Sequence, residues 1–405
     1  MMGKLVVTNQ QHWGEEVYSL LSWFDLEKVK NARVMVVGAG ALGNEVLKNL
    51  ALFGIGNIVI VDFDVIEYSN LCRSVLFRKE DASSKRPKVE AAAQRIREIN
   101  PDVNILTING DIGPDVGLGI IREMDVVIGC LDSRYARYLI NQHCFRANKT
   151  WIDGAIENLE GYVRIFSPES NCYECSLTPE ELQHITLRTG CPDIAKVNTT
   201  FGRVATTPVS SSIIGAIQVQ EALKIIHKDK SDEESFRHRS LIGKLFKYDG
   251  MFLESRIFKM ESFHPGCPSH DLWEPVIQVE KLSASAKIED ALAMIKEATK
   301  SNQVVINLRN NAFIKKIIPE KTEKEYNVLL PESKMSEFLQ NNSLGINLSE
   351  RIYQDFVENI GDDFQYKNLT LNQIGIPFYD IIQVSTSRGF SYVELSGDKE
   401  ILTFN

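Results

Sequence analysis

The stretch from Val34 to Gly43 reads VMVVGAGALG, and it decides the fold of this chain. A run of β-branched residues passes directly into a G-x-G-x-x-G loop. A helix-length segment follows, and then a second β-branched run, IVIVD, which ends at Asp62. A strand, a glycine turn, a helix and a second strand ending in an acid form the fingerprint of a nucleotide-binding βαβ unit. The sequence therefore predicts that the chain binds a nucleotide.

Each of the three glycines has its own task in such a turn. Gly38 allows the tight turn, Gly40 lets a phosphate approach the backbone, and Gly43 lets the helix pack closely on the strand. The phosphate would meet unpaired N–H groups and the positive dipole end of the helix that starts here. The acid at position 62 stands where a ribose hydroxyl would be bound.

Length and composition limit the classes of protein that the chain can represent. Its 405 residues are enough for two or three domains of about 150 residues each, and a hydrophobic content of 43% supports a packed core. A net charge of −9 argues against a dedicated nucleic-acid binder. No apolar run reaches the roughly 18 residues that a membrane span needs, and no signal peptide is visible. We therefore expect a cytoplasmic protein.

Strand and helix patterns alternate along the first half of the chain. We expect strands near 33–37, 57–62, 103–108, 125–129 and 161–166, and helices near 41–53, 86–99, 114–122 and 133–147. This alternation predicts an α/β fold with a Rossmann-like, mostly parallel sheet and helices on both faces. Asp132 follows the carboxyl end of one of these strands, at the edge where open α/β sheets bind ligands.

The remaining segments divide the chain into two domains. The patterns predict a helical segment over 14–30, a polar crossover over 180–207, a long helix over 209–226 and strands near 241–248 and 253–258. The pattern changes near residues 271–275, after which strands and a helix predict a small α+β domain. We therefore expect a first domain over residues 1–272 and a second over residues 275–405.

Two short pairs of residues have the spacing of metal ligands. Cys172 and Cys175 form a C-x-x-C pair, and Cys267 and His270 form a C-x-x-H pair. Three thiolates and one imidazole make a tetrahedral set for structural zinc. Two pairs so far apart would clamp a late segment onto an early one. The alternative is two unrelated surface turns.

Cys191 lies apart from these pairs, in the segment TGCPDI of the polar crossover. Pro192 suits the first position of a helix, and a sulfur at a helix N-terminus has its thiolate form favoured. A thiol of this kind can act as a nucleophile. An ordinary loop cysteine is the alternative.

Charged and polar residues follow the second strand of the nucleotide-binding unit. A dehydrogenase needs few cations here, whereas an adenylation reaction must stabilise a transferring phosphorus and a leaving pyrophosphate. Arg73 and Lys88 could do this, Asn70 could orient a phosphate, and Asp132 could hold Mg²⁺. Each of these four residues could also be an ordinary surface residue. The inference of an adenylation site therefore depends on their occurring together.

These motifs, in this order, resemble those of the ubiquitin-activating enzyme superfamily, which includes the sulfur-carrier adenylyltransferases of molybdopterin and thiamine synthesis. The similarity runs from about Asp25 to His270. It is carried by DFDVIEYSNLCR (62–73), RPKVE (86–90), LDSRYAR (131–137), IDG (152–154) and CYEC (172–175).

The resemblance implies an ATP-dependent activating enzyme that adenylates the C-terminal glycine of a ubiquitin-like protein, with residues 1–272 as the adenylation domain. It also implies site residues by position. Nucleotide contacts would come from Gly38, Gly40, Gly43, Asp62, Asp64, Asn70, Arg73, Lys88 and Asp132, of which Arg73, Lys88 and Asp132 would be catalytic. Asp132 would hold Mg²⁺, and zinc would be held by Cys172, Cys175, Cys267 and His270.

Two features favour the branch of the superfamily that carries its protein onward as a thioester. Cys191, followed by PDIA, is similar to the catalytic cysteine of eukaryotic activators. Residues 275–405 resemble their C-terminal ubiquitin-fold domain, which recruits a conjugating enzyme. The implied partners are a ubiquitin-like protein, a conjugating enzyme and a second subunit, in a homodimer or alternatively a heterodimer, with no nucleic acid and no membrane.

Three alternatives remain open: a sulfur-carrier adenylyltransferase without thioester transfer, a non-catalytic scaffold subunit and a dinucleotide oxidoreductase. Two departures from the family pattern bear on them. Family members place an arginine before the first strand that reaches the partner's ATP, whereas Arg33, the first arginine here, begins the strand. The crossover is also too short for the large catalytic-cysteine domain of full-length activators, which implies a compact bacterial form.

Overall fold

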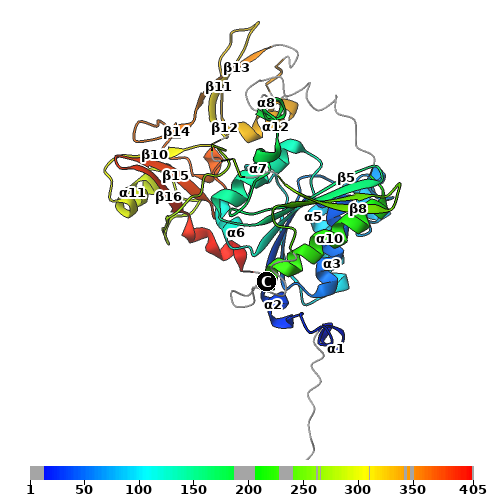
Figure 1. Ribbon diagram of the computed structural model, residues 1–405. Helices are drawn as coiled ribbons and strands as arrows, with labels where there is room; N and C mark the ends of the chain where they lie inside the picture. The colour runs from blue at the N-terminus through cyan, green and yellow to red at the C-terminus, as the bar shows by residue number, and fades with distance from the viewer. Residues whose placement is uncertain are drawn as a thin grey trace, which may run out of the picture.

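The computed structural model (Figure 1) describes residues 13–186, 206–227, 240–260, 263–264, 266–309, 311–341, 344–346 and 351–403. Three sheets organise these residues: one of eight strands, one of five and one of three. Four of the seven neighbouring strand pairs in the large sheet are parallel, so the expected α/β fold with a mostly parallel sheet is confirmed. Within these ranges, no helix has both the length and the apolar character to cross a membrane.

The parallel half of the large sheet has β1 (Arg33–Val37) at its centre. On one side of β1 lie β2 (Asn57–Val61) and β3 (Asn104–Ile108), and on the other lie β4 (Val126–Gly129) and β5 (Trp151–Glu157). Most of these strands are rich in Val and Ile, whose branched side chains suit a sheet that is buried on both faces. Their carboxyl ends meet at one edge, where the glycine loop begins.

The sequence prediction missed β5 and, with it, the change from parallel to antiparallel pairing. β5 pairs antiparallel with β6 (Glu160–Phe166). β6 then pairs antiparallel with β7 (Lys244–Asp249), and β7 pairs antiparallel with β8 (Glu254–Lys259). β5 contains a glycine and two acids, a composition with low strand propensity. Its pairing with strands on both sides overrides that propensity.

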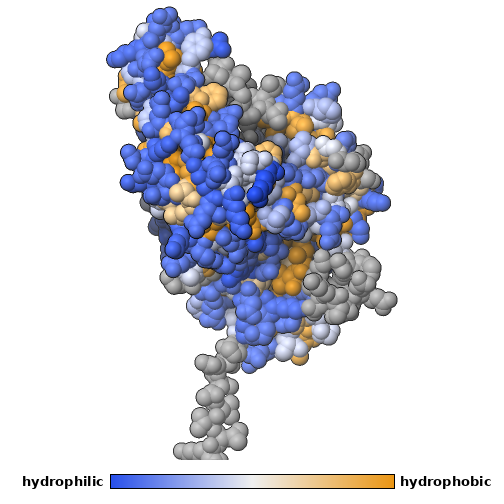
Figure 2. Space-filling model, turned by 90° about the vertical axis from the view of Figure 1, so that its left-hand side faces the viewer, coloured by the Kyte–Doolittle hydropathy of each residue, from blue (hydrophilic) through white to orange (hydrophobic). Residues whose placement is uncertain are grey.

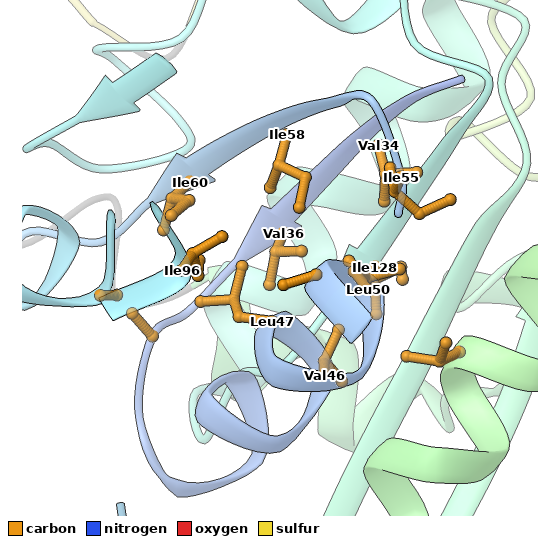
Figure 3. Close-up of a cluster of buried hydrophobic side chains, with 14 of the residues drawn as sticks. Val34, Val36, Val46, Leu47, Leu50, Ile55, Ile58, Ile60, Ile96 and Ile128 are labelled. Atoms are coloured by element: carbon orange, nitrogen blue, oxygen red, sulfur yellow. The ribbon is translucent and has the colours of Figure 1, made fainter. Parts of the chain in front are cut away.

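Helices cover both faces of this sheet. α3 (Ala41–Phe53), α5 (Lys88–Ile99) and α10 (Pro208–Ile226) lie on one face, where they help to bury Val34 and Val36 of β1 (Figure 3). α6 (Leu118–Arg122) and α7 (Arg134–Arg146) lie on the other face, against Met35 and Val37. Successive residues of β1 thus point to opposite faces, as the period of a strand requires.

Shorter helices complete the first part of the chain. α4 (Lys79–Ser83) precedes α5, and α8 (Pro179–Thr186) begins the crossover. α1 (Glu15–Tyr18) and α2 (Leu26–Asn31) replace the continuous helical segment expected over 14–30. The expectation was wrong because the Asp25 carboxylate starts a new helix, accepting hydrogen bonds from the N–H groups of Glu27 at 3.0 Å and Lys28 at 3.2 Å.

The C-terminal part contains the two smaller sheets. The five-stranded sheet, in the order β14-β10-β15-β16-β9, consists of β9 (Val276–Gln278), β10 (Val304–Asn307), β14 (Asn359–Ile360), β15 (Ile381–Thr386) and β16 (Gly389–Glu394). α11 (Ile288–Thr299) packs with this sheet in a separate hydrophobic core. Strands and a helix were expected in this part of the chain, but the sequence prediction missed β14.

A three-stranded sheet projects from this part of the molecule (Figure 1). It contains β11 (Phe313–Pro319), β12 (Tyr326–Pro331) and β13 (Ile352–Val357), and α12 (Met335–Asn341) packs beside it. The sequence prediction missed β11 and β13. Figure 2 shows this side of the molecule, where hydrophilic residues cover most of the surface and apolar residues form small patches.

The C-terminal part packs directly against α6. Tyr379 is fully buried in the same core as α6 and α7. A Cβ on Gly119 would lie only 2.4 Å from the Tyr379 carbonyl oxygen, so the two backbones touch. Arg122 Nη1 lies 2.7 Å from Oε2 of the buried Glu394. The C-terminal part is therefore held against the large sheet by a shared core and an ion pair.

The half-buried Asp380 should make the stability of this contact depend on pH. Asp380 Oδ1 accepts a hydrogen bond from the Leu118 N–H at 2.8 Å. Burial raises the pKa of Asp380 to about 7, although hydrogen bonds from Leu118 and Ile381 and the charge of Arg146 oppose the rise. An acid with a higher pKa in the folded than in the unfolded protein binds its proton more tightly when folded.

The free energy of unfolding should therefore fall as the pH rises from about 4 to about 7. In Asp380→Asn this part of the pH dependence should be absent, because the amide stays neutral and its oxygen still accepts the Leu118 N–H. Urea unfolding at several pH values across that window measures the effect. An identical pH dependence in the wild type and the variant would contradict the assignment.

Candidate functional site

The glycine loop follows the end of β1. Two of its three glycines are packed so closely that no side chain would fit there. Gly38 has a φ of 96°, and a Cβ there would lie 2.5 Å from the Cys130 carbonyl oxygen. A Cβ on Gly43 would lie 1.9 Å from the Gly38 carbonyl oxygen. A Cβ on Gly40 would meet no heavy atom within 4 Å, so the space before it is open. The loop therefore has the three properties that a phosphate site needs: a tight turn, close packing of the helix, and open space through which a phosphate can reach the Gly40 backbone.

Asp62 follows β2 and lies beside this loop. Its Oδ2 accepts the Ala39 N–H at 2.7 Å, and its Oδ1 accepts the Asp64 N–H at 2.8 Å. Burial raises the pKa of Asp62, while the charge of Lys88 and the two hydrogen bonds favour the carboxylate. Each carboxylate oxygen has a further lone pair, so Asp62 can still accept hydrogen bonds from a ribose.

Lys88 and Asp64 form an ion pair close to Asp62. Lys88 Nζ lies 2.6 Å from Asp64 Oδ2. The Lys88 side chain is nearly buried, whereas Asp64 is exposed. A buried ammonium group needs a partner of opposite charge, and Asp64 is that partner here. The ion pair holds the ammonium group beside the glycine loop, where a phosphate could share it.

Arg73 and Asn70 lie on the segment that follows Asp62, and both are half-buried. Arg73 Nη1 donates a hydrogen bond to Thr206 Oγ1 at 2.5 Å. Asn70 Oδ1 accepts the Glu67 N–H at 2.9 Å, so part of its amide stabilises a local turn. Arg73 therefore reaches Thr206 at the end of the crossover, whereas Asn70 is oriented by its own segment.

Asp132 is exposed just beyond the carboxyl end of β4. β4 and β1 are parallel neighbours, with Gly129 opposite Val37, so their carboxyl ends lie side by side. The Ser133 hydroxyl caps α7 by accepting the Ala136 N–H at 3.3 Å. Asp132 therefore stands at the same edge as the glycine loop, where a carboxylate could hold Mg²⁺.

The motifs LDSRYAR and IDG meet in a buried ion-pair network that sequence reasoning missed. Asp153 accepts hydrogen bonds from Arg137 Nε at 2.8 Å and from Arg164 Nε at 3.0 Å. Burial opposes the charge on Asp153, but the two guanidinium groups hold its pKa below its usual range. Arg137 also donates to the Leu131 carbonyl oxygen, and it thereby fixes the loop that carries Asp132. The sequence did contain a signal for this network: Arg137 and Asp153 are charged residues of the two motifs, and neither had been given a role in binding the nucleotide.

Arg33 lies at the opposite edge of the sheet from the glycine loop. It begins β1, whereas the loop follows the end of that strand. Its Nη1 lies 2.8 Å from Glu123 Oε2, and its backbone N–H donates to Asp125 Oδ2 at 2.8 Å. Arg33 therefore cannot contact a nucleotide bound at the carboxyl edge of its own chain.

Cys191 lies outside the described residues, but both ends of the crossover are placed. α8 enters the crossover beside α7, with Arg134 Nη1 2.8 Å from Glu181 Oε1. Thr206 lies at the end of the crossover and forms a parallel bridge with Asn158, in the turn between β5 and β6. Both ends therefore lie at the carboxyl edge of the sheet. The nucleophilic role of Cys191 stays a prediction.

The four residues with metal-ligand spacing come together. The ligand atoms of Cys172, Cys175, Cys267 and His270 all lie within 4.8 Å of one another. The Cys172 and Cys267 sulfurs are 3.6 Å apart, and Cys175 Sγ is 3.4 Å from His270 Nε2. Zinc–sulfur bonds of about 2.3 Å in a tetrahedron place two sulfurs roughly 3.8 Å apart. The set therefore has the composition and size for one zinc ion.

The surroundings of this cluster also suit a structural metal. The rings of Phe145 and Phe263 lie 4.7 and 4.2 Å from the His270 ring, measured between centroids. Burial raises the pKa of the Cys172 thiol, and it raises that of Cys267 to about 11. The protein alone would keep these sulfurs protonated, whereas a bound zinc ion favours thiolates.

Comparison with known proteins matches residues 11–269 to the ThiF family. A molybdopterin-synthase adenylyltransferase of Salmonella typhimurium is 30% identical over 260 residues, which cover 61% of this chain and 92% of that protein. A SAMP-activating enzyme E1 of Haloferax volcanii is 33% identical over 241 residues, 60% of this chain and 81% of that protein. A solved structure of E. coli MccB with succinimide is 24% identical, with a TM-score of 0.49, and covers 60% of this chain and 68% of that one.

Loss of one cluster ligand should remove the metal and weaken the fold. In Cys172→Ser we expect the zinc content to fall from one ion per chain to nearly none, measured by mass spectrometry of the native protein. The free energy of unfolding should fall as well, because zinc binding contributes to folding. Cys144→Ser is the matched control, since Cys144 is also a buried cysteine but lies outside the cluster. A wild type without zinc, or zinc retained in Cys172→Ser, would contradict the ligand set.

Proposed function

This chain belongs to the ThiF family and is an adenylyltransferase of that family, and we propose that it activates the C-terminal glycine of a ubiquitin-like protein with ATP. In the first step, a carboxylate oxygen of that glycine attacks the α-phosphorus of ATP. The bond from this phosphorus to the pyrophosphate group breaks as the new bond forms. The products are a mixed anhydride and pyrophosphate.

The proposal is carried by the grouping of polar features at one sheet edge. The open face of the glycine loop, the Asp62 carboxylate, the Lys88 ammonium group and Asp132 all lie there. ATP carries more negative charge than a dinucleotide, and its pyrophosphate leaves more easily beside cations. Lys88 and Arg73 are two such cations, and they favour ATP over a nicotinamide dinucleotide.

We assign the site residues as follows. Gly38 and Gly43 shape the loop, the Gly40 backbone binds a phosphate oxygen, and Asp62 binds the ribose. The triphosphate is contacted by Asn70, Arg73 and Lys88, with Asp64 holding Lys88 in place. Asp132 holds Mg²⁺, which neutralises charge on the departing pyrophosphate. Zinc, held by Cys172, Cys175, Cys267 and His270, is structural.

A ubiquitin-like protein can approach this edge over the turn between β7 and β8. β6 runs antiparallel to both β5 and β7, so the end of β7 lies at the carboxyl edge of β5. The turn that follows presents three apolar side chains, Met251, Phe252 and Leu253, which are 69%, 74% and 81% exposed. Clustered exposed apolar residues are typical of a protein contact.

Cys191 receives the activated glycine in the second step of this proposal. Its thiolate attacks the acyl carbon of the mixed anhydride, a thioester forms, and AMP leaves. The positions of α8 and Thr206 support this role, because they bring both ends of the crossover to the sheet edge. Residues 275–405 form a ubiquitin-fold-like domain that recruits the conjugating enzyme, and the chain works as a homodimer.

Adenylation of a sulfur-carrier protein without transfer to a cysteine is the second candidate. The similarity to a molybdopterin-synthase adenylyltransferase favours it. Both candidates share the adenylation step, and they differ in whether Cys191 carries the product.

Asp132→Ala tests the adenylation step. We expect ATP–pyrophosphate exchange, measured with the cognate ubiquitin-like protein, to fall by about a hundredfold or more, because charge on the leaving group loses its stabilisation. The midpoint of thermal unfolding should not change, since Asp132 is exposed. Asp102→Ala, which removes an exposed carboxylate before β3 at the other sheet edge, should keep full exchange. Normal exchange in Asp132→Ala would contradict the metal-binding role.

Cys191→Ala separates the two candidate functions. We expect it to keep ATP–pyrophosphate exchange within about threefold of wild type, because the nucleophile acts after adenylation. The wild type should form a band with its ubiquitin-like protein that disappears on addition of a thiol reductant, and Cys191→Ala should not. Exchange without such a band in the wild type would favour the sulfur-carrier candidate.

A further inference from the structure

We infer that Asn44 is a positioning residue that aims N–H groups of the glycine loop at the phosphates of ATP, an inference that rests on the proposed function. Asn44 lies in α3, directly after the last glycine of the loop, and its side chain is completely buried. The G-x-G-x-x-G pattern places no requirement on this position. Its role follows from its hydrogen bonds.

The side-chain amide of Asn44 makes three hydrogen bonds, all to backbone groups. Nδ2 donates to the carbonyl oxygens of Ala39 at 2.8 Å and Gly40 at 3.0 Å. Oδ1 accepts the Leu76 N–H at 2.8 Å. A buried amide paired on both sides fixes the groups that it touches, because any movement leaves polar groups without partners.

The directions of the two carbonyl groups determine the directions of the next two N–H groups. In a planar trans peptide, the C=O and the N–H that follows it point in opposite directions. The Asn44 side chain holds the Ala39 carbonyl group, and the side chain together with the Asn44 backbone N–H, at 2.9 Å, holds the Gly40 carbonyl group. The N–H groups of Gly40 and Ala41 therefore point away from Asn44. Neither N–H has a hydrogen-bond acceptor among the residues that the structure describes, and the space before Gly40 is open. Both are available to phosphate oxygens.

The third hydrogen bond joins the loop to the segment that carries Arg73. Leu76 lies three residues after Arg73 and is buried, so its position limits the path of that segment. Asn44 therefore fixes two sets of proposed phosphate contacts relative to each other. One set is the pair of loop N–H groups, and the other is the Arg73 guanidinium group.

Asn100 provides a matched comparison, because it is a buried asparagine that follows α5 and contacts the other end of α3. It is 1% exposed, its Nδ2 donates to the Ala51 carbonyl oxygen at 3.0 Å, and its Oδ1 accepts the Asp102 N–H at 3.0 Å. Both asparagines tie one end of α3 to a neighbouring segment. Only Asn44 contacts the peptides that would bind phosphate.

The test compares the full-length wild type with Asn44→Ala, Asn44→Asp and Asn100→Ala. The Kd for ATP with Mg²⁺ is measured by isothermal titration calorimetry, and thermal unfolding is recorded for each variant. In Asn44→Ala we expect the Kd to rise about tenfold or more, which corresponds to losing one hydrogen bond to a charged group. Asn100→Ala should unfold at a similarly lowered temperature but keep the wild-type Kd.

The aspartate variant separates the donor from the acceptor. Asn44→Asp keeps an acceptor for the Leu76 N–H but places a carboxylate against two carbonyl oxygens, so its Kd should rise more than that of Asn44→Ala. Asn44→Ser, which keeps a small polar side chain, replaces Asn44→Ala if that variant does not fold, and a rise in its Kd is again expected.

The outcomes distinguish this inference from the proposed function. An unchanged Kd in Asn44→Ala, or equal increases in Asn44→Ala and Asn100→Ala, would overturn the role of Asn44 and leave the proposed function intact. A wild type that binds no ATP would overturn the proposed function, and the role of Asn44 toward phosphate with it.

Discussion

The close contact between α3 and the end of β1 is the constraint on which the candidate site depends. A Cβ on Gly43 would lie 1.9 Å from the Gly38 carbonyl oxygen, so only glycine lets the helix start so near the strand. The Cys130 carbonyl oxygen closes the other side of the turn and ties the end of β4 to it. The helix N-terminus and the loop that carries Asp132 are therefore held at one place by backbone packing.

Buried polar groups then fix the segments around this turn. Asn44 joins the loop to the segment after β2, Asp153 joins β5 to α7 through Arg137, and Gln218 donates from α10 to backbone carbonyl groups of β4 and β5. A desolvated polar group that loses its partner is costly, so these segments have few alternative positions. The Cys/His cluster and the contact of Tyr379 with α6 extend this arrangement to the C-terminal part.

Sequence patterns predicted the parts of the structure that neighbouring residues decide. Buried β-branched runs and the glycine turn predicted β1 to β4, and ligand spacing predicted the Cys/His cluster. β5, β11 and β13 were missed because they carry polar or charged residues and are held by pairing with the neighbouring strands of their sheets. Asn44 and the Arg137–Asp153 pair were missed for a related reason, since their partners follow no fixed spacing. The role of Cys191 stays a prediction.

The central claim is that the carboxyl edge of the large sheet binds a triphosphate. A crystal structure of the chain grown with ATP and Mg²⁺, and with NADH offered in competition, tests it most directly. We predict the triphosphate against the Gly40 backbone, the ribose at Asp62 and a cation at Asp132. Nicotinamide dinucleotide bound at this edge, or ATP bound elsewhere on the molecule, would contradict the claim.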